Sequence, residues 1–292
     1  MVGSVCRVAA DPVPEAPVLL AVLGRGVVDA ATPVLSATDE GFTRGDGCFE
    51  GCRLVDGAVA KLDAHLARMA RSASALGLPF DAASWHAFVS DSVAHLPRTG
   101  ESALKLVLSR GPSGGAPLGL LFVTPVPADT PRQRRDGIGI VTLPRGTAST
   151  AYADAPWLLG GVKTLSYAVN MAAQREARRR GADDVVFVSS DGYVLEAPTS
   201  SVVLAVGRDL LTTPIAGTGI LGGTTQALLF ERAARDGWRT GEVLSTVADL
   251  AAADSCWLVS TVRGPVDVVA IDGEPRPRDL ARTARIRELC GF

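Results

Sequence analysis

The chain has 292 residues, of which 47% are hydrophobic and 21% are charged, and its formal net charge is −2. This composition supports ordinary hydrophobic cores in one large domain or two medium ones, and it excludes an intrinsically disordered chain. The small net charge gives no general attraction to nucleic acid or membranes, and no uninterrupted apolar run could span a bilayer. We therefore expect a cytoplasmic protein with neither kind of partner.

The cysteines and histidines do not form a recognisable metal-binding pattern. Five cysteines are scattered along the chain, and the three histidines all lie in one third of it. Cys48 and Cys52 form one close pair, but no second cysteine pair and no histidine pair accompanies them. The spacing therefore predicts no metal site.

The first half of the chain predicts a loose extension followed by strands and helices. Residues 1–17 contain three prolines and are expected to form the extension, while glycine interrupts the apolar runs of residues 18–35, as is typical of strands and turns. Apolar residues at helical spacing then predict a helix over residues 63–76. The expected elements are helices over 63–76 and 82–96 and strands over 104–108 and 118–123.

Residues 124–136 are the predicted boundary between two domains. This segment contains three prolines and a run of charged residues, and it has no apolar periodicity. We expect a linker here, with one domain over residues 18–123 and a larger one over residues 137–292.

The second half alternates short apolar strands with amphipathic helices. Glycines and polar residues mark the ends of most of these segments. The expected elements are strands over 138–143, 185–188, 193–196, 202–206, 210–213 and 257–260, helices over 164–180 and from 224 to about 237, a glycine-rich loop over 217–223, and a hairpin at 272–273.

Lys163 is the most informative single residue. The chain has 29 lysines and arginines, of which only three are lysine, so 29 − 3 = 26 are arginine. Such usage can reflect base composition alone. However, a primary amine that can lose its proton and form a Schiff base is a property that arginine cannot supply. Lys163 follows two glycines and precedes an amphipathic stretch, which makes it a candidate catalytic residue.

Three further features could bind a ligand. Glu196 is a lone carboxylate that closes an apolar strand, and Ser260 and Thr261 end another strand. The glycine-rich loop runs into a helix at Thr224, so its backbone N–H groups could converge on an anion. Together with Arg68, which lies off the apolar stripe of its helix, this loop predicts a phosphate site. The alternative is a simple turn with a threonine cap.

A nicotinamide dinucleotide site is a remote alternative. Gly217, Gly219 and Gly222 match G-x-G-x-x-G, and Glu242 follows at about the right distance. A dinucleotide fold requires these glycines in the tight turn after the first strand of a βαβ unit. Pro214 precedes the glycines here, which disfavours that interpretation. A binding protein without catalytic activity is equally remote.

Five motifs in this order resemble one known family, the fold-type IV pyridoxal-phosphate (PLP) enzymes, also called class IV aminotransferases. The motifs occupy residues 45–50, 65–69, 163–167, 196–201 and 219–225. The resemblance covers roughly residues 18–275. It implies a two-domain α/β (α+β) fold with a small N-terminal α/β domain and a larger C-terminal pseudo-barrel domain. It also implies PLP as cofactor and a homodimer that acts on a small amine or amino acid.

The resemblance also implies roles for individual residues. Lys163 is similar to the lysine that carries the cofactor and moves protons, Glu196 to the carboxylate that faces the pyridine nitrogen, and Arg68 to the arginine that grips the phosphate. Further cofactor contacts are implied for Thr224, Thr225, Ser260, Thr261 and Tyr167.

The motifs favour one subgroup of the family. D-amino-acid aminotransferases have arginine and histidine where this chain has Gly115 and Pro117, which disfavours that subgroup. Residues 49–53 are similar to the corresponding segment of branched-chain aminotransferases. Residues 109–111 and 163–171 more closely resemble 4-amino-4-deoxychorismate lyases. The expected function is therefore a lyase that forms p-aminobenzoate and pyruvate for folate precursor synthesis. An aminotransferase for branched-chain or D-amino acids is the alternative. The candidates for holding substrate carboxylates are Arg53, Arg110 and Arg263.

Overall fold

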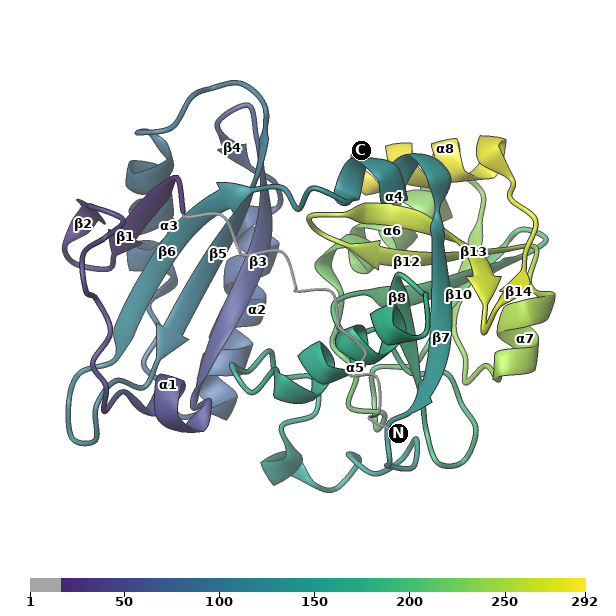
Figure 1. Ribbon diagram of the computed structural model, residues 1–292, viewed down its shortest axis with the longest axis horizontal. Coiled ribbons are helices and arrows are strands. Elements are labelled where there is room, and N and C mark those ends of the chain that lie inside the picture. The colour runs from purple at the N-terminus through teal and green to yellow at the C-terminus, as the bar shows by residue number, and fades with distance from the viewer. Residues whose placement is uncertain (1–16) are drawn as a thin grey trace, which may run out of the picture.

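The computed structural model describes residues 17–292 as a mixed α/β fold built on two β-sheets. The predicted extension over residues 1–17 lies outside the described residues except for its last position. The two sheets lie side by side, and the chain passes from the first to the second only once, after strand β6 (Figure 1). None of the helices in residues 17–292 is long and apolar enough to cross a membrane.

The first sheet has six antiparallel strands in the order β2-β1-β6-β5-β3-β4. Its strands are β1 Leu19–Val22, β2 Gly26–Val28, β3 Gly47–Val55, β4 Ala58–Val59, β5 Glu101–Ser109 and β6 Leu118–Pro125. The helices of this half are α1 Glu40–Arg44, α2 Leu62–Ala75 and α3 Ala82–Val93. The helices and strands expected for residues 63–123 are therefore confirmed, with ends that differ by a few residues.

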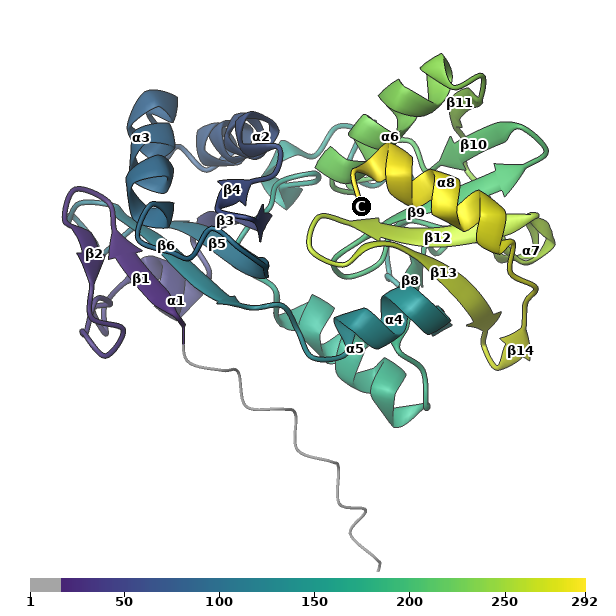
Figure 2. The ribbon, with the colours of Figure 1, turned by 90° about the horizontal axis from the view of Figure 1, so that it is seen from above.

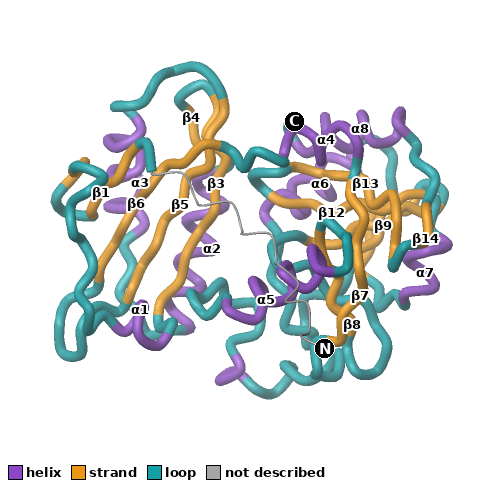
Figure 3. The backbone as a smooth tube through the Cα atoms, in the orientation of Figure 1, coloured by secondary structure: helices purple, strands orange, loops and turns teal. Residues whose placement is uncertain are grey.

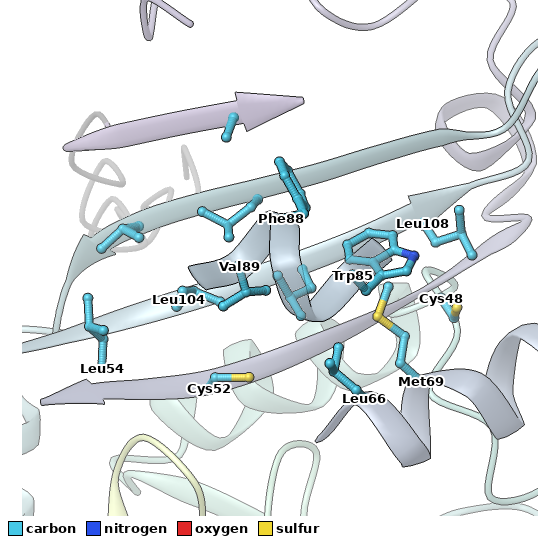
Figure 4. Close-up of a cluster of buried hydrophobic side chains, with 14 of the residues drawn as sticks. Cys48, Cys52, Leu54, Leu66, Met69, Trp85, Phe88, Val89, Leu104 and Leu108 are labelled. Carbon is cyan, nitrogen blue, oxygen red and sulfur yellow. The ribbon is translucent and has the colours of Figure 1, made fainter. Parts of the chain in front are cut away.

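Side-chain alternation gives the first sheet two different faces. Alternate residues of a strand point to opposite sides, so Leu104, Leu106 and Leu108 face α2 and α3, whereas Lys105 faces away from them. The helix-covered face holds the hydrophobic core (Figure 4), which includes Cys48, Cys52, Leu54, Leu66, Met69, Trp85, Phe88, Val89, Leu104 and Leu108. The opposite face of the sheet is left to form the wall of a cavity.

The second sheet has eight strands, seven of them in the order β11-β10-β9-β12-β13-β7-β8, with β14 paired to β13. Its strands are β7 Ile138–Pro144, β8 Asp184–Val188, β9 Ser201–Val206, β10 Asp209–Thr212, β11 Arg239–Glu242, β12 Ser255–Ser260, β13 Gly264–Ile271 and β14 Glu274–Pro275. The helices are α4 Thr130–Asp136, the short 3₁₀ helix η1 Pro156–Leu158, α5 Ala168–Arg179, α6 Thr224–Arg235, α7 Val247–Ala252 and α8 Leu280–Cys290.

The second sheet is buried on both faces, which explains its nearly continuous apolar strands. On β12, Cys256 and Leu258 belong to one hydrophobic cluster with β7 and β13, whereas Trp257 and Val259 pack with residues of α6 and α8. Figure 2 shows α6 and α8 on one side of this sheet and α4 and α5 on the other. Fully burying one such large apolar side chain stabilises the fold by roughly 1.5 to 3 kcal/mol.

Three features of this half differ from or add to the expectations. The segment 124–136, expected to be the linker between two domains, contains helix α4, which the sequence pattern did not predict. Residues 193–196, expected to be a strand, form only isolated bridges. The helix expected over residues 164–180 begins at Ala168, so Lys163 lies in the loop before it. Between β7 and α5 the chain is loop apart from η1 and turns (Figure 3).

Helix α4 has no apolar periodicity by which it could be predicted, because ion pairs and hydrogen bonds to backbone carbonyls hold it in place. Arg134 binds Glu101 of the first sheet through two nitrogens, and it also donates to the carbonyl oxygens of Val262 and Arg263. Arg132 pairs with Asp183 at 2.5 Å. The helix therefore connects the two sheets through charged side chains and needs no apolar stripe.

Candidate active site

A cavity of about 900 Å³ brings together most of the site residues expected from the sequence. Its lining comes from β3 and β5 of the first sheet, from the loop that precedes α5, and from residues 196–201, 219–225 and 259–263. A second cavity of about 830 Å³ lies beside α3 and is lined largely by apolar side chains, including Trp85 and Phe88. It contains none of the expected site residues.

The backbone of Lys163 is fixed to the first half of the molecule. Its N–H donates to Ser72 Oγ of α2 at 3.2 Å, and its carbonyl oxygen accepts from Phe49 N of β3 at 3.0 Å. The side-chain nitrogen donates to Tyr167 Oη at 3.1 Å and lies 4.4 Å from the centre of the Phe49 ring. Burial, and then the positive charge of Arg68, lowers the pKa of the Lys163 amine to about 8. This amine is therefore much closer to its neutral, nucleophilic form than an exposed lysine.

Glu196 approaches the same cavity from the second half of the molecule. One carboxylate oxygen accepts the backbone N–H of Leu221 at 3.0 Å. Burial raises the pKa of this carboxyl group to about 7, although that hydrogen bond and the charges of Lys163 and Arg145 oppose the shift. A ligand that places a cationic N–H group beside Glu196 would therefore favour the carboxylate form.

Arg68 belongs to a buried network of three side chains. Its Nε and one terminal nitrogen each donate to Glu50 at 2.7 Å, and the other terminal nitrogen donates to the carbonyl oxygen of Gly222 at 2.8 Å. His65 Nδ1 lies 2.7 Å from the same carboxylate. Burial disfavours ionisation of Glu50, but the hydrogen bonds from Arg68 and His65 outweigh it and lower its pKa. Burial lowers the pKa of His65, which favours the neutral ring.

Three threonine hydroxyl groups converge beside this network. Thr261 Oγ1 lies 3.2 Å from Thr224 Oγ1 and 3.1 Å from Thr225 Oγ1, and His65 Nε2 lies 3.5 Å from the hydroxyls of Thr224 and Thr261. Lys61 Nζ donates to Thr225 Oγ1 at 2.5 Å. Because Thr224 and Thr225 begin α6, the unpaired N–H groups of the first helical turn lie at the same place. We call this group of residues 61, 65, 68, 224, 225 and 261 the anion pocket.

The glycine-rich loop that leads to the anion pocket is shaped by close contacts. Gly219 has φ +74°, and a Cβ atom there would lie 2.4 Å from the ring of Tyr152. Only glycine therefore fits at this position of the loop.

The structure also tests the dinucleotide alternative. The neighbouring strands β10 and β11 are parallel and flank α6, so they form a βαβ unit. However, Thr213 to Ala216 separate β10 from the glycines, and Glu242 is exposed. The tight turn that a dinucleotide site requires is therefore absent from this unit.

The three arginines expected to hold substrate carboxylates already have partners. Arg53 pairs with Glu101 at 2.6 Å and Arg110 with Asp46 at 2.6 Å, and neither lines the cavity. Arg263 lines the cavity, but it pairs with the buried Asp184 at 2.7 Å and donates to Ser200 Oγ. These contacts give all three a structural role. Ser260 lines the cavity, as expected, beside Thr261.

Two cations that sequence reasoning missed face the cavity without a carboxylate. Lys105 Nζ lies 4.5 Å from the Phe49 ring centre, and the Arg145 guanidinium lies 5.1 Å from the ring centre of Phe187. Neither side chain forms an ion pair within residues 17–292. Burial lowers the pKa of Lys105. The scarcity of lysine was the available signal, because Lys61, Lys105 and Lys163 all lie at this site.

These side chains fit a phosphate-bearing aldehyde cofactor. The anion pocket supplies hydroxyl, N–H and cationic donors to a phosphate group, while Lys163 offers an amine with a lowered pKa within the same cavity. Glu196 offers a carboxylate to a ring nitrogen. No group of three or more His, Cys, Asp or Glu side chains in the described part of the chain could hold a metal ion.

The chain is similar to known proteins. A family model described as amino-transferase class IV matches residues 47–271. Over 262 residues the chain is 42% identical to a bifunctional aminodeoxychorismate lyase / D-amino acid transaminase from Mycobacterium tuberculosis, which covers 86% of this chain and 91% of the relative.

Solved structures agree with this match. A hypothetical aminotransferase from Mycobacterium tuberculosis in its PLP-bound form is 41% identical, with a TM-score of 0.89 over 94% of this chain and 97% of that one. A hypothetical aminotransferase from the same organism has also been solved with α-ketoglutarate and PMP bound. A fold IV-transaminase from Curtobacterium pusillum is also 41% identical, with a TM-score of 0.88 over 94% of this chain and 99% of that one.

The expected fold class and cofactor are thus confirmed, and the nicotinamide and non-catalytic alternatives are removed. The chain belongs to the class IV aminotransferase family and is a PLP-dependent enzyme of fold type IV.

Proposed function

We propose that this enzyme is a 4-amino-4-deoxychorismate lyase, which releases p-aminobenzoate and pyruvate. The observation that carries the proposal is the pair of cations, Lys105 and Arg145, that face the cavity without a carboxylate partner. The lyase substrate carries two carboxylates, so one cation is available for each. The Mycobacterium tuberculosis relative named as a bifunctional lyase and transaminase supports the same assignment.

The anion pocket, Glu196 and Lys163 would hold the cofactor in this proposal. Arg68, Thr224, Thr225 and Thr261 would donate to its phosphate, and Ser260 lies beside them. Glu196 would accept a hydrogen bond from the protonated pyridine nitrogen, and Lys163 would bind the reactive carbon. When bound, PLP supplies an electrophilic aldehyde and a ring that accepts electrons from the amine-bearing carbon of the substrate.

Lys163 performs the proton transfers. Because its pKa is lowered to about 8, a useful fraction of the amine is neutral near physiological pH and can remove the proton from the amine-bearing carbon. Tyr167, whose Oη is 3.1 Å from the amine, orients it. Loss of that proton lets the carbon–oxygen bond to the enolpyruvyl group break. Pyruvate then leaves after protonation, and the remaining ring becomes aromatic.

D-amino-acid transamination is the second candidate. α-Ketoglutarate, which is bound in one of the similar Mycobacterium tuberculosis structures, is also a dicarboxylate and suits the same two cations. In that reaction, Lys163 would again carry the proton, water would release the keto acid, and the amino group would remain on the cofactor. The bifunctional relative is named for both activities.

Product analysis distinguishes the two candidates. With 4-amino-4-deoxychorismate alone, we expect p-aminobenzoate and pyruvate in equal amounts, because elimination returns the cofactor to its aldehyde form in every cycle. Transamination leaves the cofactor as the amine and requires a keto acid. Turnover of D-amino acids that depends on added α-ketoglutarate, without release of pyruvate from the first substrate, would contradict the lyase assignment.

We also propose a division into domains over residues 18–123 and 137–292, and a homodimer in the cytoplasm. The hydrophobic core of the first sheet is separate from the clusters of the second, which supports two domains. Four cysteines within residues 17–292 are free and buried, which suits a reducing compartment. The homodimer follows from the family resemblance, and size-exclusion chromatography with light scattering tests it.

A further inference from the structure

Lys61 occupies an energetically costly position directly beside the anion pocket. It precedes α2 in a left-handed backbone conformation with φ +58°, which is uncommon for a residue with a Cβ atom, and its side chain does not cap the helix. Burial lowers the pKa of its amine to about 8. The amine contacts Thr225 Oγ1 and forms no ion pair with a carboxylate in the described residues. Nothing in the local helix therefore explains a half-buried lysine in a left-handed conformation here.

The charges of the anion pocket make Lys61 unusual. Glu50 binds Arg68 through two hydrogen bonds, so the charges of this carboxylate and guanidinium cancel within the pocket wall. Burial lowers the pKa of His65, so that ring is neutral near physiological pH. Lys61 is then the remaining side chain of the pocket that adds net positive charge. A doubly charged phosphate placed there would meet one full charge from Lys61 in addition to the partial charges of the α6 N-terminus.

We propose that Lys61 is a direct ligand of the cofactor phosphate and makes the enzyme selective for the phosphorylated cofactor. The inference rests on the assignment of the anion pocket to the phosphate made above. In this arrangement Arg68 donates to the phosphate and also holds the glycine-rich loop through Gly222, while Glu50 balances its charge. Lys61 supplies the charge that the phosphate neutralises, and Thr225 positions its amine at 2.5 Å.

The test compares two cofactors that differ only in the phosphate. Apoprotein is titrated with PLP and with pyridoxal, and binding is followed by the visible absorbance of the cofactor bound at Lys163. For Lys61→Met we expect the dissociation constant of PLP to rise on the order of 10- to 100-fold and that of pyridoxal to stay within about twofold. Lys61→Arg should retain most of the preference for PLP.

Lys105→Met is the matched control, because Lys105 is also a half-buried lysine but lines the cavity outside the anion pocket. This variant should keep the wild-type ratio of the two dissociation constants. Inorganic phosphate provides a readout without the cofactor ring. It should compete with PLP for the wild-type apoprotein, and its inhibition constant should rise in Lys61→Met by about the same factor as the dissociation constant of PLP.

The possible outcomes distinguish the role of Lys61 from the assignment of the anion pocket to the phosphate. If wild-type apoprotein prefers PLP and Lys61→Met keeps that preference, or loses affinity for PLP and pyridoxal equally, the role of Lys61 is contradicted while the anion pocket stands. If the wild-type apoprotein shows no preference for PLP over pyridoxal, the assignment of the pocket and the role of Lys61 are both overturned. Unchanged thermal unfolding of the Lys61→Met apoprotein confirms that the variant is folded.

Discussion

The anion pocket and the rest of the cavity wall differ in how completely their polar groups are paired. At the anion pocket, Arg68, Glu50 and His65 form a buried network, and the nearby threonine hydroxyls contact one another. Elsewhere on the cavity wall, Lys105 and Arg145 lie beside aromatic rings and, within residues 17–292, form no ion pair with a carboxylate. The anion pocket is therefore largely preorganised, with Lys61 as its one charge that lacks a carboxylate in the described residues, whereas neither Lys105 nor Arg145 has a counter-ion there.

This difference separates permanent interactions from those that form anew in each catalytic cycle. A cofactor remains bound through many turnovers, so the residues that hold it can be rigid and hydrogen-bonded. A substrate must enter and leave, so the groups that recognise it remain unpaired until it binds. Lys163 lines the same cavity, and burial and the charge of Arg68 lower its pKa to about 8.

The largest effect on catalysis is expected when the Lys163 side chain is removed. Lys163→Ala should lower kcat by about 10³-fold or more, because the nucleophile and the proton carrier are lost together. The anion pocket is separate, so the variant should still bind PLP, though without a covalent link. Steady-state kinetics and equilibrium dialysis measure the two properties. Turnover near the wild-type rate would remove Lys163 from the chemistry.

A smaller effect is expected when Glu196 loses its charge. Glu196→Gln should lower kcat on the order of 10²-fold, because a neutral amide no longer favours the protonated ring nitrogen. The dissociation constant of PLP should change little, since the phosphate contacts remain. A variant with wild-type kcat would show that Glu196 is only a structural carboxylate that accepts from Leu221.

Lys105→Met tests whether an unpaired cation of the cavity wall binds the substrate. We expect KM for the dicarboxylate substrate to rise roughly 10-fold or more, with a smaller change in kcat, because a charge-assisted contact made in the ground state is lost. Lys105→Arg preserves the charge and should recover much of the loss. A fall in kcat with unchanged KM would instead indicate a role in the transition state.

The smallest expected effect concerns the stability of the apoprotein. Burial raises the pKa of Glu196 from 4.5 to about 7, so stability from its protonated form is full below about pH 4.5 and is lost as the pH rises through 7. Glu196→Gln stays neutral, so at pH 8 its free energy of unfolding should exceed the wild-type value by roughly 1 to 3 kcal/mol. The difference should vanish near pH 4.5. Urea unfolding at the two pH values measures it, and equal stability at pH 8 would contradict the burial of this charge.

The sequence predicted many of the strands, the main helices and the cofactor motif, because these depend on local patterns, but it missed β3, β11 and β13. Alternation on β5 and the helical stripe of α2 are visible within single segments. Helix α8 was missed because much of its exposed surface is arginine and its apolar contacts lie with a distant sheet. Helix α4 was missed because Arg134 holds it through contacts with Glu101.

The same distinction applies to the site. Lys163, Glu196 and Thr225 belong to compact motifs, so their grouping could be predicted. Lys61 meets Thr225 across 164 residues of sequence, and no local pattern indicates that contact. Arg53, Arg110 and Arg263 were chosen for their charge, but a sequence does not show that each is already paired with a carboxylate.

Lys105 and Lys163 line the cavity and Lys61 contacts its wall at Thr225, so three lysines have three different roles, and one measurement tests this division directly. The PLP-loaded enzyme is reduced with borohydride, which fixes the cofactor to whichever amine carries it, and the digested protein is mapped by mass spectrometry. We expect one modified peptide, which contains Lys163, and unmodified peptides for Lys61 and Lys105. Attachment of the cofactor to Lys61 or Lys105 would contradict it.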